Sequence, residues 1–524
     1  MKRNLLKAIG ISFLIFAILS WIIPVGTYSS GKLSTTGINP VGLGDLINKP
    51  ISSVVTFALY GVLFAAIGGF YGVVEESGAL EKKVSKIAKS YKGREKKFLI
   101  ITAVTFILLS SLTGLVFPLF VLVPLFAAIL FRLNYDKITV LAATVGSLLL
   151  GNVVSTYGFN ITGYTKNLLS LDMNFQIVPK VIILILLTII FALWIIRNSK
   201  IEVRKDSKKV EEKKEVKSEV KAATKKSTTK TTAKKTTTKS AAKKPTTKKT
   251  TTKKSTRKSN TKALAVIPDM IKVKEKDHIK GTAFIVILVL LLVVAFLGMY
   301  NWYYSFKIDI FSKAHEAVMG VKIKDFAIFE KLLGGINQFG AWSNLEFSGL
   351  LIVTSWIISR IYKMKFNNYV ESFIAGVKKW LPTAIYSTLA SVILVVLYSA
   401  LQGGSGSFVT TINAKLFELS DGFNPIITGI STLLGSFFFN DLYYLLADMT
   451  AFVSSYKGTD LSTAGLVIQS VYGIAMMIFP TSILLISGLS LFDVSYKEWI
   501  KYIWKFALIT LLLVLVTCSI VVLL

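Results

Sequence analysis

The stretch FLIITAVTFILLSSLTGLVFPLFVLVPLFAAILF, residues 98–131, is an apolar run too long for one membrane crossing. A single helical span needs about 20 residues to cross a hydrocarbon core of roughly 30 Å. Shorter apolar runs recur along all 524 residues, of which 53% are hydrophobic and 17% charged, and the mean hydropathy is +0.61. Helices satisfy their own backbone in lipid, so the sequence predicts an all-α polytopic membrane protein.

The apolar runs predict about nine full spans and two hairpins. The first run is longer than a signal-peptide core and has no small-residue cleavage site after it, so it is expected to be retained as a span. The candidate spans are 5–23, 53–74, 98–131, 138–157, 176–196, 281–299, 347–362, 379–400, 425–450, 464–489 and 502–523.

Charge between the spans predicts their orientation. Lys and Arg gather in 81–97 and 197–280, which the positive-inside rule assigns to the cytoplasm together with the N-terminus. The run at 98–131 must then start and end inside, as two short spans or as one re-entrant hairpin. If 425–450 is a second hairpin, entering from outside, the basic segment 495–505 also falls inside.

This order predicts two inverted repeats, each with a re-entrant hairpin and a broken helix. The expected domains are membrane repeat 1 (1–200), a Lys/Thr-rich linker (201–280), a connector span with an extracellular segment (281–346) and membrane repeat 2 (347–524). Inverted repeats with broken helices are typical of secondary transporters whose site lies near the bilayer midplane.

The linker carries much of the net charge of +32. Residues 201–262 hold 23 Lys/Arg and six Asp/Glu, with no apolar periodicity, which predicts a disordered cytoplasmic segment. A solvated linker is the first interpretation, and attachment to anionic lipid headgroups is the second. Nucleic acid is not an expected partner, because no aromatic residues are interleaved to stack on bases.

The scarcity of cysteine and histidine excludes several kinds of chemistry. Cys518 is the only cysteine, and His278 and His315, the two histidines, lie outside the apolar runs. A disulfide framework and a cysteine-based metal site are therefore impossible. No ATP-binding or catalytic motif appears, so we expect neither an enzyme nor a metal site nor a cofactor, and a Na⁺ or H⁺ gradient as the energy source.

Two interruptions of apolar runs predict a binding site. Segments 151–163 and 478–482 place glycine, proline and small polar residues where a span should continue. Irregular backbone at membrane depth is tolerated only inside protein or beside a water-filled cavity; the alternative is a packing kink. The candidate substrate-binding residues are Asn152, Ser155, Thr156, Asn160, Thr162, Pro480, Thr481 and Ser482.

Acidic residues inside the second hairpin are candidates for the coupling ion. Asp441 and Asp448 are seven residues apart, a spacing that predicts one helical face, and Asn440 precedes them. Acids at membrane depth are costly and suggest function. The alternative is that Asp441 caps a half-helix and Asp448 reaches the outer surface. No Lys or Arg is expected deep in a span.

Four stretches resemble the YfcC branch of the DcuC-type carriers. They are WIIPVGTYSSGK with INPVGLGDLI (21–47), IGGFYGVVEESGALEKKVSKI (67–87), LNYDKITVLAATVGSLLLG (133–151) and IFPTSILLISGLSLFDVSYKEWIKYIWKF (478–506). The resemblance implies an inverted-repeat carrier of amino acids or C4-dicarboxylates, working as a homodimer. At the hairpin tips, 110–118 and 434–444, the chain departs from the family pattern.

The sequence therefore predicts a secondary transporter that takes up or exchanges a small polar solute, an amino acid or a C4-dicarboxylate. The alternative is a membrane receptor or scaffold that keeps the carrier fold without transport. The expected partners are that solute, the lipid bilayer of a bacterial plasma membrane and a second copy of the chain. We expect Asn160 and Thr481 to face one shared cavity, with Asp441 on its outer approach.

Overall fold

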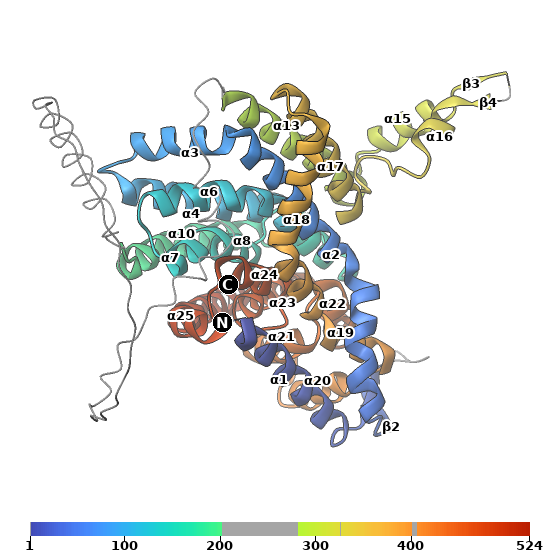
Figure 1. The fold of residues 1–524 in the computed structure, drawn as a ribbon. Helices are drawn as coiled ribbons and strands as arrows, with labels where there is room; N and C mark the ends of the chain where they lie inside the picture. The colour runs from blue at the N-terminus through green and yellow to red at the C-terminus, as the bar shows by residue number, and fades with distance from the viewer. Residues whose placement is uncertain (1, 202–280, 325, 401–405, 524) are drawn as a thin grey trace, which may run out of the picture. The chain divides into compact units, whose positions relative to one another are not determined.

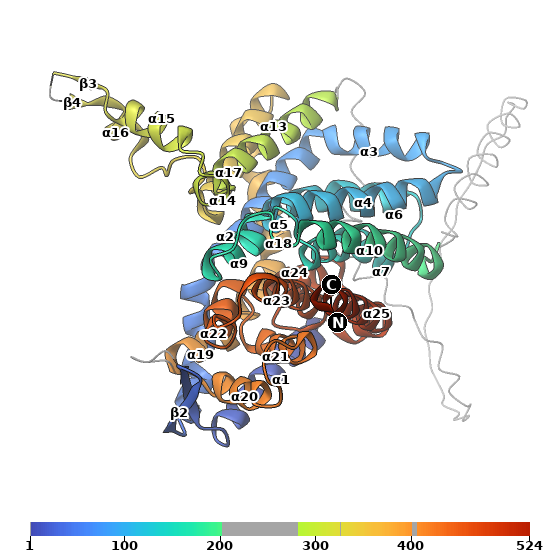
Figure 2. The ribbon, with the colours of Figure 1, turned by 180° about the vertical axis from the view of Figure 1, so that it is seen from behind.

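The computed structural model describes residues 2–201, 281–324, 326–400 and 406–523. The chain divides into two compact units, one formed by Met1–Lys200 with Leu264–Leu524 and the other by Ile201–Ala263. The expected linker, 201–280, lies outside the described residues except for Ile201. The rest of this section concerns the described part of the first unit, which is mostly helical (Figures 1 and 2).

The first half contains ten α-helices, two π-helical segments and one 3-10 turn. The α-helices are α1 (Lys2–Ser20), α2 (Leu43–Ser77), α3 (Ala79–Ser90), α4 (Glu95–Thr113), α5 (Val116–Leu119), α6 (Val123–Arg132), α7 (Lys137–Leu141), α8 (Ser147–Val153), α9 (Tyr164–Leu168) and α10 (Ile177–Asn198). The 3-10 turn is η1 (Phe120–Leu122), and the π-helical segments are η2 (Ala142–Gly146) and η3 (Phe159–Gly163).

The second half follows a similar order of elements. Its helices are α13 (Thr282–Met299), α14 (Trp302–Phe306), α15 (Ile310–Met319), α16 (Ile328–Leu333), α17 (Asn344–Ile361), α18 (Phe366–Leu389), α19 (Val392–Ala400), α20 (Phe408–Phe417), α21 (Pro425–Phe438), α22 (Leu442–Val453), α23 (Gly458–Ile478), α24 (Ile483–Phe492) and α25 (Tyr496–Leu523). Each half thus contains a helical hairpin (α4 to α6, and α21 with α22), then a broken helix, then a long helix (α10 or α25).

Seven helices of the described chain are long and apolar enough to cross a membrane, and five apolar helices are shorter. The long ones include α2, α4, α10, α13 and α25, together with α18–α19 and α23–α24. The estimate of about nine full spans counted α1, α7–α8 and α17 among them and placed α4 in the first hairpin. Residues Lys137–Val153, which contain α7 and α8, are among the shorter apolar helices. The apolar part of α1 is shorter than 18 residues, and α17 carries Asn344, Glu346 and Arg360 at its ends.

The expectation of an all-α fold was wrong in detail, because two small β-hairpins are present. Strands β1 (Val25–Ser29) and β2 (Lys32–Gly37) pair antiparallel, as do β3 (Lys322–Ile323) and β4 (Phe326–Ala327). The first hairpin turns through Ser30 and Gly31, both at positive φ, a conformation that suits tight hairpin turns. Its signal was the dipeptide Ser-Gly between two short runs of β-forming residues.

Two long helices from opposite halves, α2 and α18, pack closely along their lengths (Figure 1). A Cβ atom at Gly72 would lie 2.2 Å from the Ser372 carbonyl oxygen, and one at Gly376 would lie 2.1 Å from the Gly68 carbonyl oxygen. Small residues at four-residue spacing let membrane helices approach in this way. The pair therefore depends on glycine, and larger residues would push the helices apart.

Ion pairs join loops and helix ends that the charge pattern assigns to the cytoplasm. Lys379 Nζ lies 2.8 Å from Glu75 Oε2, and Lys137 Nζ lies 3.7 Å from Asp493 Oδ2. Arg132 pairs with Glu81 in the same way. These contacts join the end of α2 to α18, the end of α6 to the start of α3, and the start of α7 to the end of α24.

Candidate functional site

The backbone at the first helix break is hydrogen-bonded to a serine of the neighbouring hairpin. Helix α8 ends at Val153, and residues 154–158 are irregular before η3 begins. Ser111 Oγ donates to the Val154 carbonyl at 2.5 Å, and the Ser111 carbonyl accepts from the Thr156 amide at 3.0 Å. The Ser155 carbonyl accepts from Thr162 Oγ1 at 2.7 Å. The backbone groups that the break frees are therefore satisfied inside the protein.

The second break separates α23 from α24 at residues 479–482. Ser482 is the N-cap of α24 and accepts from the Leu485 amide at 3.4 Å. The Thr481 carbonyl accepts from Asn440 Nδ2, at the tip of the second hairpin, at 2.9 Å. Near the break, α23 crosses α8 so closely that a Cβ at Gly473 would lie 2.5 Å from the Val153 Cα.

The two hairpin tips meet the two breaks. At the first tip, Gly114 has a φ of +69°, and a Cβ there would lie 2.1 Å from Asn160 Oδ1 and 3.0 Å from the Gly158 Cα. At the second tip, Asp441 is the N-cap of α22 and accepts from the Tyr443 amide at 2.9 Å. Tyr472 of α23 donates its hydroxyl hydrogen to the Asn440 carbonyl at 2.9 Å.

Between the tips and the breaks lies a cavity of about 330 Å³. Its walls come from both hairpins, both breaks, the middle of α2 and the start of α17. The lining residues are Tyr60, Gly114, Leu115, Val116, Phe117, Pro118, Leu149, Asn152, Phe159, Asn160, Ile161, Tyr164, Met299, Trp342, Ser343, Asn344, Asn440, Asp441, Leu442, Tyr472, Met476, Ser482, Ile483 and Leu484.

Five of the residues singled out from the sequence line this cavity. They are Asn152, Asn160, Asn440, Asp441 and Ser482. The others, Ser155, Thr156, Thr162, Pro480, Thr481 and Asp448, are not among its lining residues. Asn160 lines the cavity and Thr481 does not, and the residue that lines it from the second break is Ser482.

The expectation that Asp441 and Asp448 share a helical face was wrong. Asp441 stands before the first turn of α22, so the seven-residue spacing does not apply to it. Asp448 instead accepts hydrogen bonds from Thr410 Oγ1 at 2.5 Å and from Asn413 Nδ2 at 3.1 Å, both on α20. Asp441 faces the cavity, whereas Asp448 joins the second hairpin to α20.

One basic side chain departs from the expectation for the spans. Lys180, in the first turn of α10, is fully buried, and its Nζ lies 3.4 Å from the ring centroid of Phe175. Within the described part of the chain, Nζ has no hydrogen-bond partner. Lys180 does not line the cavity, so it adds no positive charge to the wall that a solute would meet.

Sequence reasoning missed the aromatic wall and the contribution of α17. Tyr60, Tyr164 and Tyr472 come from three different helices, Trp342 from the segment before α17 and Asn344 from the first turn of α17. Nothing in the sequence marked Tyr60 and Tyr472 as cavity-lining residues, because aromatic residues in apolar runs usually belong to the hydrophobic core. The glycine and proline of the segment SLTGLVFP did mark the first tip.

The polar side chains of the cavity wall include one charged group. Asn440 Nδ2 donates to the Thr481 and Ala390 carbonyls. Oδ1 of Asn440 and Oδ1 of Asn160 are buried and have no hydrogen-bond partner in the described structure. The other polar groups of the wall are mainly amides and hydroxyls, which can both donate and accept. Among the described lining residues the Asp441 carboxylate is the one charged group, and none is Lys or Arg.

The described residues contain no group of three or more His, Cys, Asp or Glu side chains arranged to hold a metal ion. The carboxylate, amides and hydroxyls of the wall can bind a small polar solute by hydrogen bonding. The chemistry that this arrangement supports is reversible binding of a solute.

A membrane protein that encloses a polar cavity between helix breaks and hairpin tips has the architecture of a carrier. Residues 5–239 match DcuC, the C4-dicarboxylate anaerobic carrier family. That range includes all of the first half, with its hairpin and its break, and somewhat less than half of the whole chain. The family is one of transporters rather than enzymes. Comparison with curated proteins and with solved structures gave no match.

Proposed function

We propose that this multi-pass membrane protein is a secondary transporter that binds a small polar solute in the central cavity. The observation that carries the proposal is the meeting of both hairpin tips and both helix breaks around one polar space. The match to a carrier family over the first half supports it. Transport powered by a Na⁺ or H⁺ gradient fits a chain in which no nucleotide-binding motif appears.

The Asp441 carboxylate favours an amino acid as the substrate. It suits a solute ammonium group, and hydrogen bonds to charged groups contribute about 1.5–3 kcal/mol each. The solute carboxylate would lie near the N-termini of α24 and α17, where backbone amides favour negative charge. A solute with both groups matches both parts of the wall.

A C4-dicarboxylate is the second candidate, favoured by the description of the matching family. Its two negative charges would meet the Asp441 carboxylate in a cavity whose described walls contain no Lys or Arg. Like charges a few ångströms apart in a partly desolvated site repel one another by several kcal/mol. The dicarboxylate therefore fits this cavity less well unless Asp441 is protonated or a cation binds with it.

Uptake into proteoliposomes tests the proposal and separates the candidates. Radiolabelled amino acids and C4-dicarboxylates would be supplied with and without Na⁺ or pH gradients. We expect gradient-dependent accumulation of at least one amino acid. Accumulation of dicarboxylates alone would overturn the substrate assignment, and binding without uptake of any solute would favour the receptor alternative.

We further propose the inverted arrangement of the two halves and an N-terminus in the cytoplasm. The repeated order of hairpin, broken helix and long helix supports the inversion. The ion pairs Glu75–Lys379 and Lys137–Asp493 support the orientation, because they join segments that charge assigns to the same side. With Cys518 replaced by Ser, a single cysteine at position 498 should be labelled from the cytoplasmic side only.

Membership in the YfcC branch and assembly as a homodimer complete the proposal. Both follow from the resemblance of the four sequence motifs. Large apolar side chains are exposed on α2 and α17, such as Val55 and Trp356. They form a surface that suits contact with a second copy of the chain or with lipid. Cross-linking in proteoliposomes over a range of protein-to-lipid ratios would measure the dimer.

A further inference from the structure

A second cavity, of about 430 Å³, lies beside the first half of α2. It is separate from the central cavity and shares no lining residue with it. Its described lining residues are Lys49, Ser52, Thr56, Phe57, Leu394, Val395 and Tyr444. We call this space the outer cavity, since the charge pattern predicts that α2 begins on the extracellular side.

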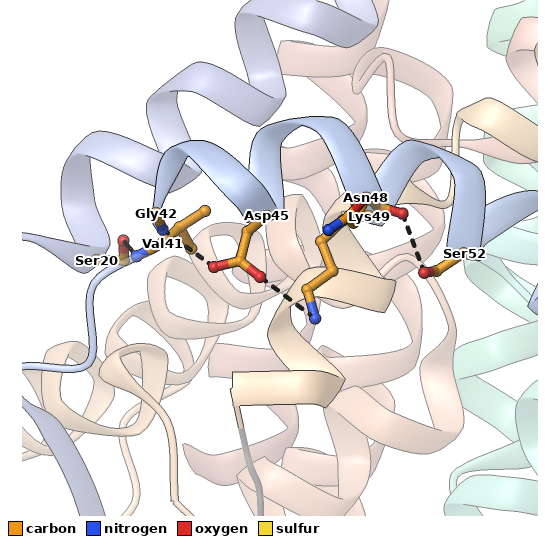
Figure 3. Close-up of polar contacts among 7 residues, drawn as sticks. All are labelled: Ser20, Val41, Gly42, Asp45, Asn48, Lys49 and Ser52. Carbon is orange, nitrogen blue, oxygen red and sulfur yellow. Dashed lines mark hydrogen bonds and ion pairs between the residues drawn. The ribbon is translucent and has the colours of Figure 1, made fainter.

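The wall that α2 contributes is a polar stripe. Asp45, Lys49, Ser52, Thr56 and Tyr60 follow one another at three- or four-residue intervals and so share one helical face. Lys49 Nζ lies 3.5 Å from Asp45 Oδ1, and Ser52 Oγ donates to the Asn48 carbonyl at 3.0 Å (Figure 3). Asp45 Oδ2 in turn accepts from the Gly42 amide at 3.0 Å, which fixes the carboxylate beside Lys49.

The opposite face of the same helix is apolar and exposed. Ile47, Ile51 and Val54 have exposed fractions of 68%, 64% and 49%. A membrane helix with one apolar exposed face and one polar face turns the polar face toward protein or water. The stripe therefore indicates that the outer cavity is filled with water rather than lipid.

A partition of aromatic rings separates the outer cavity from the central cavity. The ring of Phe57, which lines the outer cavity, is stacked 6.1 Å from the ring of Tyr60, which lines the central cavity. On the second hairpin, the ring centroids of Tyr443 and Tyr444 are 5.5 Å apart. The Tyr443 ring also lies 5.7 Å from the ring of Tyr164.

The helix is not regular at the partition. Phe57 has φ −111° and ψ 18°, outside the helical range, so α2 is kinked there. The kink changes the direction of the helix between Phe57, which lines the outer cavity, and Tyr60, which lines the central cavity. The rings that separate the two cavities therefore sit at a local break in the scaffold helix.

The two cavities have complementary charge. Among the described lining residues, Lys49 is the one cation of the outer cavity and Asp441 is the one anion of the central cavity. Lys49 is paired with Asp45 in this structure, so a solute carboxylate binds Lys49 by sharing or replacing that contact, beside the hydroxyls of Ser52 and Thr56. An ammonium group is attracted to Asp441, beyond the aromatic partition.

We propose that the outer cavity is a solute-binding vestibule, in which Lys49 captures a solute by its carboxylate before the solute passes the Tyr60 and Tyr444 rings into the central cavity. The proposal rests on the proposed transport function for its solute, but its geometry can be tested without transport. Capture by Lys49 orients the solute with its carboxylate outward and its other end toward Asp441.

Thiol labelling of full-length protein in proteoliposomes tests the vestibule. With Cys518 replaced by Ser, Ser52→Cys places a thiol on the polar stripe. Val54→Cys places one at the same depth on the opposite face and is the matched control. The probes are two membrane-impermeant thiol reagents, anionic sulfonatoethyl methanethiosulfonate and cationic trimethylammonioethyl methanethiosulfonate, applied from outside.

We expect the Ser52→Cys thiol to react at least about tenfold faster than the Val54→Cys thiol, because impermeant reagents reach thiols only through water. We also expect Lys49→Gln to lower the ratio of anionic to cationic labelling rates at position 52 severalfold. Equally slow labelling at both positions would show a lipid-filled cavity and overturn the vestibule. An unchanged ratio in Lys49→Gln would overturn the role of Lys49.

Uptake measurements then separate this proposal from the transport function itself. Lys49→Gln should raise the KM for the transported solute severalfold while leaving the maximal rate near that of the parent protein. An unchanged KM would overturn the capture step while transport stands. If the parent protein takes up no solute, the transport proposal fails, and the labelling result still decides whether the vestibule is open to water.

Discussion

The two halves of the protein follow the same order of hairpin and broken helix, but the polar groups near the two breaks have different partners. At the first break, Ser111 and Thr162 occupy the Val154 and Ser155 carbonyls, so the kink is closed within the protein. At the second hairpin tip, Asn440 Nδ2 holds the Thr481 carbonyl, while the Asp441 side chain lines the cavity. The comparison teaches that both halves build the wall, and that the second half supplies the one charged group among its described lining residues.

The largest expected effect tests the second half. Asp441→Asn removes the one carboxylate of the cavity wall and keeps the shape of the side chain. We expect the affinity for a solute with an ammonium group to fall about tenfold to a hundredfold, since a hydrogen bond to a charged group is worth about 1.5–3 kcal/mol. Equilibrium binding of the transported amino acid to purified protein measures the loss.

Asp448→Asn is the matched control for that prediction. Asp448 lies on the same hairpin but holds Thr410 and Asn413 rather than a solute. Its substitution should lower thermal stability more than affinity. Equal losses of affinity in both variants would contradict the separate roles assigned to the two acids.

A smaller effect is expected at the first break. Asn160→Ala removes an uncharged acceptor from the cavity and should weaken binding roughly twofold to tenfold, as loss of about 0.5–1.5 kcal/mol requires. Thr481→Val, at a buried hydroxyl that does not line the cavity, should leave the dissociation constant unchanged. A larger loss of solute affinity in Thr481→Val than in Asn160→Ala would show that Thr481, and not Asn160, contacts the solute.

The closed kink of the first half predicts a stability effect without a binding effect. Ser111→Ala leaves the buried Val154 carbonyl without its donor, which should cost about 1–3 kcal/mol of unfolding free energy. Exposed Ser90 donates only within its own turn, so Ser90→Ala should cost less than about 0.5 kcal/mol. Thermal unfolding in detergent measures both, and a weaker solute affinity in Ser111→Ala would mean that the first break also binds.

The smallest effect is expected at Lys180, the buried cation of the first half. Its Nζ has no hydrogen-bond partner in the described structure, so burying its charge is costly. Lys180→Met, with a side chain of similar length, should leave transport unchanged and leave thermal stability equal or slightly higher. A loss of transport in a well-folded Lys180→Met protein would contradict this prediction and show that Lys180 takes part in transport.

The sequence by itself determined the helical membrane class, the two hairpins and the two breaks. Hydropathy sets the length of a span, and glycine, proline and small polar residues mark where an apolar helix stops, so these features are local. The β1–β2 hairpin was readable in the same way from its Ser-Gly turn, although it was not expected. The carrier relationship also followed from local motifs and was confirmed over residues 5–239.

Only the tertiary structure decided which polar residues face the cavity. Thr156 and Asn160 lie in the same break, yet one bonds to Ser111 and the other lines the open space. Asp441 and Asp448 have the same spacing as two residues on one helical face, but the helix begins after the first of them. Such outcomes depend on partners that are distant in the sequence, from Ser111 for Thr156 to Gln469 for Ser155, and no local pattern encodes them.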